Sequence, residues 1–82
     1  MLISFEEAVS RIPFGKWKHF KGGEYEVLGI AKDSETLEPI VLYRALYGEG
    51  QLWTRPAAMW LETVLRDGDC VSRFIYLGGD PL

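Results

Sequence analysis

Apolar residues recur at helical spacing only near the start of the chain. They are Phe5, Ala8, Val9 and Ile12. Positions three and four apart lie on one face of a helix, so these side chains form a single apolar stripe. Ser4 can accept a hydrogen bond from the amide three residues on, and Glu7 can reach back to close a capping box. Because Pro13 and Gly15 end the pattern, the sequence predicts a helix of about two turns that needs other elements to pack against.

From Gly15 onward the pattern changes to that of β-strands, with apolar and polar residues in alternation. Five strands are predicted, at residues 24–31, 40–47, 51–55, 63–66 and 69–77. Residues typical of turns separate the strands, and they are Gly22-Gly23, Asp33-Ser34, Gly48 with Gly50, and Asp67-Gly68. Gly29 indicates a bulge or bend within the first strand, and Pro56 favours a short helical turn over residues 57–61.

Short strands joined by tight turns predict a mainly β fold, specifically a small, strongly bent, five-stranded open barrel of the SH3-like kind. Curling a small sheet toward closure would protect its edge strands. The expected organisation is an N-terminal helix within residues 1–14 that packs on a β-barrel domain of residues 15–77. Residues 78–82 are expected to form a frayed tail.

Composition narrows the possible classes of protein. With 82 residues, 48% of them hydrophobic and 26% charged, the chain is a single globular domain and too apolar to be disordered. A net charge of −3 argues against a general nucleic-acid binder. The chain lacks the roughly 20 consecutive apolar residues that would span a membrane. No signal peptide is evident and Cys70 is the sole cysteine, so a cytoplasmic protein is expected.

Catalytic groups are scarce. His19 is the only histidine, and it is expected to cap a loop or bond a backbone group. Cys70 falls within an apolar strand and is expected to be buried and structural. One histidine and one cysteine cannot complete a zinc site, so neither a metal nor a cofactor is predicted. A small enzyme that uses His19 with Glu24, Glu26 or Cys70 is the remotest of the functions considered.

Residues 15–21 form the one basic cluster of the sequence, with three lysines and no acidic residue. Lys16, Lys18 and Lys21 beside Trp17 could follow a phosphate backbone and stack bases, which gives contact with RNA or a single strand as an alternative function. The favoured interpretation is a strand with Trp17 buried and the lysines in water.

The segment LYRALYGEGQLWTRP, residues 42–56, is the strongest candidate site. Two strands meet there across a short turn, which can bring Tyr43 or Arg44 beside Trp53 or Arg55. An arginine beside an aromatic ring can stack and also bind a carboxylate or phosphate through its planar fork. A structural explanation stays open, in which Arg44–Glu26 or Arg55–Glu38 ion pairs fix the strand register.

A family resemblance covers about Gly15 to Phe74. The chain resembles DUF1653, an uncharacterised bacterial family known as a domain of unknown function. The motifs that carry the resemblance are His19-Phe20-Lys21-Gly22, Tyr25-Glu26-Val27, Glu35-Thr36-Leu37-Glu38, residues 41–48, Leu52-Trp53, Arg55-Pro56 and Arg73-Phe74. The resemblance implies a small, mainly β, cytoplasmic domain, and it brings no known activity, cofactor or partner.

The function expected from the sequence is therefore that of a non-catalytic binding module. Its proposed ligand site consists of Tyr43, Arg44, Trp53, Arg55 and His19. The partner would be a protein segment or a small anionic ligand. A homodimer formed through exposed strands or aromatic patches is also compatible with the sequence.

Overall fold

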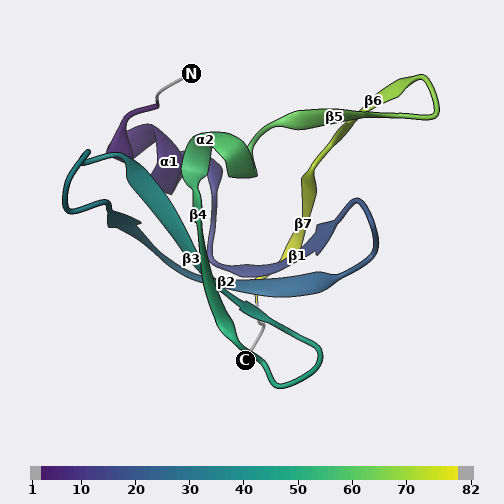
Figure 1. The fold of residues 1–82 in the computed structure, drawn as a ribbon, viewed down its shortest axis with the longest axis horizontal. Helices are drawn as coiled ribbons and strands as arrows, with labels where there is room; N and C mark the ends of the chain where they lie inside the picture. Colours follow the sequence, from purple (N-terminus) through teal and green to yellow (C-terminus); the bar gives the residue numbers. More distant parts are fainter. Residues whose placement is uncertain (1–2, 80–82) are drawn as a thin grey trace.

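Helix α1 begins at the cap that the sequence predicts. In the computed structural model, which describes residues 3–79, the Ser4 hydroxyl accepts a hydrogen bond of 3.0 Å from the Glu7 amide. Glu7 does not reach back but pairs with Arg11 one turn on, at 3.2 Å. Ile12 is fully buried, whereas Val9 is exposed and so lies outside the packed stripe. The helices and strands, drawn in Figure 1, are α1 (Phe5–Arg11), β1 (Gly15–His19), β2 (Glu24–Lys32), β3 (Pro39–Ala45), β4 (Leu52–Pro56), α2 (Ala57–Trp60), β5 (Thr63–Arg66), β6 (Asp69–Ser72) and β7 (Phe74–Gly78).

A five-stranded antiparallel sheet forms the body of the domain, in the order β4-β3-β2-β1-β7. The mainly β class, the short N-terminal helix and the helical turn before the last hairpin are confirmed. The bulge near Gly29 is also confirmed, because the register of β2 with β3 shifts between Val27 and Gly29. The basic segment contributes β1, as its structural interpretation required.

The sheet does not close into a barrel. Its edge strands, β4 and β7, are not paired with each other, and β5 and β6 form a separate two-stranded sheet. The Asp67-Gly68 turn forms as predicted, with both residues at positive φ. The expected last strand, however, breaks at Arg73, whose amide donates to the Glu62 carbonyl oxygen at 2.9 Å. Beyond this point β7 joins β1, so the hairpin β5–β6 projects from the sheet (Figure 1).

The predicted tail overlaps the end of this sheet. Gly78 belongs to β7 and pairs with Lys16, so it is part of the fold. The rest of the predicted tail, beyond Gly79, lies outside the described residues.

The two faces of the sheet differ in what covers them. We call the face that carries Val41 and Tyr43 the inner face and the opposite one the outer face. On the inner face, β3 contributes buried Val41, Tyr43 and Ala45. Helix α2 packs there through Trp60, whose ring stacks on Phe74 with centroids 3.7 Å apart and planes 2° apart. This aromatic pair anchors the core.

Candidate ligand-binding face

The strand register divides the four predicted site residues between the two faces. Tyr43 pairs with Trp53, and Val41 pairs with Arg55, so Trp53 and Arg55 lie on the inner face beside Tyr43. Arg44 pairs with Leu52 on the outer face and is exposed. The predicted approach of Tyr43 to Trp53 is therefore present, whereas Arg44 does not lie with the other three.

Arg55 lies in an aromatic setting and has no acidic partner within residues 3–79. Its guanidinium carbon is 5.5 Å from the centroid of the Phe74 ring. Its Nε is buried and has no hydrogen-bond partner among the described residues. Within the same part of the chain, neither the Arg55–Glu38 nor the Arg44–Glu26 pair suggested by the sequence forms an ion pair, although Glu26 and Arg44 are register partners.

Two tyrosines border this arginine. The hydroxyls of Tyr25 and Tyr47 lie 2.7 Å apart, and the Tyr25 ring meets Tyr43 edge-on at 5.4 Å. Burial, and then the hydrogen bond with Tyr47, raise the pKa of Tyr25 to about 12, against a smaller opposing effect of the Arg55 charge. The Tyr25 hydroxyl therefore stays protonated at neutral pH. Because one hydroxyl of the pair donates to the other, the pair offers one hydroxyl donor to a ligand.

His19 lies on the same face, at the end of β1. Its ring is between those of Phe20 and Phe74, with centroid distances of 4.5 and 5.0 Å. Its Nδ1 accepts a 3.1 Å hydrogen bond from the Lys21 amide, which confirms the predicted role as a loop cap.

The charges around His19 are positive. Burial lowers the pKa of His19 below its ordinary value of 6.5, and neighbouring cations lower it further. Those cations belong to Arg55, Arg73 and Lys21. The imidazole is thus held neutral near physiological pH, in a field that attracts anions.

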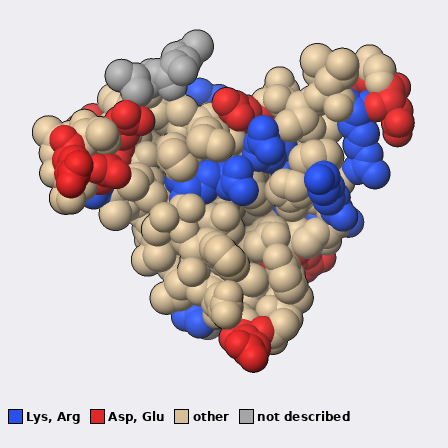
Figure 2. All heavy atoms as spheres, in the orientation of Figure 1, with Lys and Arg blue, Asp and Glu red and all other residues tan. Residues whose placement is uncertain are grey.

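Sequence reasoning did not identify two further cations beside this face. The Arg66 guanidinium donates to the Phe20 carbonyl oxygen, with its carbon 5.8 Å from the Phe20 ring centroid. Arg73 pairs with Glu62 at 3.2 Å. Arg66 and Phe20 are 46 positions apart in the sequence. The projecting hairpin brings them together, and no local sequence pattern indicates the direction in which this hairpin projects. Figure 2 shows Lys and Arg side chains gathered across the middle of this view and beneath the projecting hairpin.

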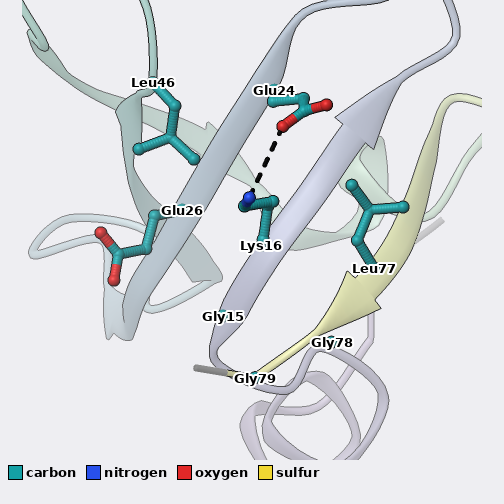
Figure 3. A pocket seen from close by; sticks show the side chains of 8 residues that line it. All are labelled: Gly15, Lys16, Glu24, Glu26, Leu46, Leu77, Gly78 and Gly79. Carbon is teal, nitrogen blue, oxygen red and sulfur yellow. Dashed lines mark ion pairs between the residues drawn. The ribbon is translucent and has the colours of Figure 1, made fainter. Parts of the chain in front are cut away.

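The basic cluster of the sequence does not form one surface. Trp17 is buried, and its Nε1 donates to the Pro13 carbonyl oxygen at 3.1 Å, so its ring cannot stack a base. Lys16 and Lys18 pair in register with Glu26 and Glu24 on the outer face. There Lys16 reaches Glu24 at 3.8 Å across an open groove of about 560 Å³ (Figure 3). Only Lys21, in the β1–β2 turn, lies near the inner face.

The expectation for Cys70 is wrong. The thiol is free and exposed, because β6 belongs to the projecting hairpin rather than to the sheet. Over residues 3–79 no cluster of three His, Cys, Asp or Glu side chains is placed to hold a metal ion. No helix in that range is long and apolar enough to cross a membrane.

Fold and site together define a small, mainly β domain that presents one aromatic and basic face. The model of the family described as "Protein of unknown function (DUF1653)" matches residues 15–76, and the chain belongs to this family. A crystal structure of a DUF1653 protein from Bordetella bronchiseptica is similar, with a TM-score of 0.78 and 33% sequence identity. The alignment covers 89% of this chain and 96% of that one. No curated protein matches the chain.

Proposed function

We propose that this domain is a non-catalytic binding module of the bacterial cytoplasm, whose inner face binds a carboxylate- or phosphate-bearing ligand. The observation that carries the proposal is the state of Arg55. Its guanidinium is half-buried, lies over Phe74 and lacks an acidic partner among the described residues. A partly desolvated cation without a counter-charge is unfavourable for the fold alone, and an anionic ligand would supply that charge.

The surroundings of Arg55 suit recognition by shape as well as charge. Trp53 is 50% exposed and lies two residues from Arg55 along β4, on the same face, where it can stack against a planar group. The Tyr25–Tyr47 hydroxyl pair adds one donor at the border of the face. A guanidinium fork binds two anionic oxygens at once, so the set favours a planar ligand with a terminal anion.

Binding is favoured over catalysis because His19 is poorly placed to act as a base. One ring nitrogen already accepts from the Lys21 amide. Burial, and then the cations around the ring, lower the pKa of His19, which weakens it as a proton acceptor near neutral pH. The bacterial setting is supported by the similar structure from Bordetella bronchiseptica.

The test is an NMR titration of the domain with inorganic phosphate, and with acetate in parallel. His19 is the only histidine of the chain, so its imidazole signals report on the inner face without ambiguity. Bound anion should shift these signals and the indole signal of Trp53, and should raise the pKa of His19. Arg55→Ala should abolish the shifts, whereas Arg44→Ala, on the outer face, should leave them intact. Saturable shifts that survive Arg55→Ala, or no shifts at all, would refute the proposal.

A further inference from the structure

Four basic side chains from three segments converge on a row of three rings. The rings follow one another as Phe74, His19 and Phe20, with centroid steps of 5.0 and 4.5 Å. Cations lie along the whole row. Strand β4 and the β1–β2 turn contribute one each, the hairpin contributes a third, and the residue that follows the hairpin is the fourth. They are Arg55, Lys21, Arg66 and Arg73.

Little acidic charge balances these cations. Among residues 3–79, Arg73 alone of the four forms an ion pair, with Glu62. The chain as a whole carries a net charge of −3, and four of its nine Lys and Arg residues lie along this row, on a face where Figure 2 shows Lys and Arg side chains gathered. Such a concentration attracts anions locally even when the global charge would repel them.

The two ends of the row each carry a cation. Arg55 lies 5.5 Å from the Phe74 ring at one end. At the other end, Lys21 Nζ and the Arg66 guanidinium carbon lie 5.7 and 5.8 Å from the Phe20 ring. Because His19 lies between the two end rings, a single anion cannot occupy both ends, whereas a chain of anions can.

Accessible rings accompany the charges. Phe20 is half-buried, and Trp53 and Tyr47 are 50% and 55% exposed. Cations that follow a backbone beside rings that stack on bases are the usual means of binding single strands without sequence preference. An acidic peptide would use the cations, but its Asp and Glu side chains carry no aromatic ring to stack on these rings.

We infer that the inner face binds single-stranded nucleic acid, with phosphates at Arg55 and between Lys21 and Arg66 and with bases stacked on Phe20 and Trp53. This inference rests on the proposed function, because it assigns a ligand class to the same face. The surface differs from the one that the sequence suggested, since Trp17, Lys16 and Lys18 take no part.

The test measures fluorescence anisotropy with labelled single-stranded RNA and DNA of mixed sequence, about 12 nucleotides long, within the range that one small β domain covers. The full chain is compared with Lys21→Gln, with Lys21→Gln/Arg66→Gln and with the control Lys16→Gln/Lys18→Gln, which removes the same charge from the outer face. Lys21→Gln alone leaves the Arg66–Phe20 hydrogen bond intact, so its effect does not depend on the hairpin. Circular dichroism verifies that each variant is folded.

Binding of the oligonucleotides by the unaltered chain should weaken as salt rises. The double variant on the inner face should bind at least about tenfold more weakly at low salt, with a log–log salt slope about 1.4 smaller, because two phosphate contacts are lost. The outer-face control should match the unaltered chain. Equal affinity for polyglutamate would instead assign the face to acidic peptides, and a loss confined to the outer-face control would place binding elsewhere. Absence of oligonucleotide binding, with the phosphate shifts of His19 still present, would refute this inference and leave the proposed function standing.

Discussion

Replacing Arg55 by methionine distinguishes an arginine kept for a ligand from one kept for the fold. In the folded domain its Nε is buried without a described partner, and its main favourable contact is with the Phe74 ring. An unsatisfied buried donor costs about 1–3 kcal/mol. A cation over an aromatic ring contributes about 0.5–2 kcal/mol. Methionine removes both effects and keeps a flexible apolar stem against Phe74. We therefore expect a change in unfolding free energy between a loss of about 1 and a gain of about 2.5 kcal/mol.

Urea unfolding followed by circular dichroism measures this change, with an unaltered m-value as evidence that only stability has moved. The phosphate titration, repeated on the same variant, should show no binding. Arg44→Met is the matched control on the outer face, and it should stay within about 0.5 kcal/mol of the unaltered chain and bind phosphate normally. A structural arginine behaves differently, because loss of one member of a buried pair costs about 3–5 kcal/mol. A loss of that size in Arg55→Met would show that the guanidinium is needed for folding and would remove the basis of the proposed function.

Two further predictions concern stability. The pKa of His19 is lower in the folded chain than its ordinary 6.5, so the unfolded chain binds the proton more readily. The contribution of His19 to the free energy of unfolding should therefore be fully present above pH 6.5 and should be lost as the pH drops through the folded-state pKa. His19→Gln should lack this component, and identical pH profiles of unfolding free energy for the two proteins would contradict the assignment. Gly15→Ala should destabilise by at least about 2 kcal/mol, because φ is +127° there and an added Cβ would lie 2.7 Å from the Gly78 carbonyl oxygen. Gly29→Ala, where a Cβ meets open space, should change the same free energy by less than about 1 kcal/mol, and equal effects at the two glycines would count against this packing.

Features that depend on near neighbours in the chain could be predicted from the sequence. The Ser4 cap, the Asp67-Gly68 turn and the bulge at Gly29 each follow from the conformational preferences of one or two residues. Alternation along β3 also separated Tyr43 from Arg44 correctly, because side-chain direction in a strand has a period of two.

Features that depend on the path of the chain in space could not be predicted in this way. Alternation says which residues share a face, but not which strand lies beside which. At the break, the Arg73 amide donates a hydrogen bond to the Glu62 carbonyl oxygen, and no local sequence pattern marks this position. The apolar spacing around Cys70 fits a core strand as well as a projecting hairpin, so the burial of its thiol could not be decided from sequence.

The open sheet and the basic face have a common origin. If residues 63–77 had formed two strands of a closed barrel, Arg66 would have been placed on a wall of that barrel, away from the β1–β2 turn. Because the chain breaks at Arg73, the hairpin instead projects beside this turn and brings Arg66 to Phe20, while β7 brings Phe74 beneath Arg55. The same break leaves β4 as an open edge, with Trp53 half exposed on the inner face. A variant of the protein in which the hairpin is shortened between β5 and β6 should therefore bind anions more weakly, because Arg66 no longer reaches Phe20, even though the five-stranded sheet stays in place.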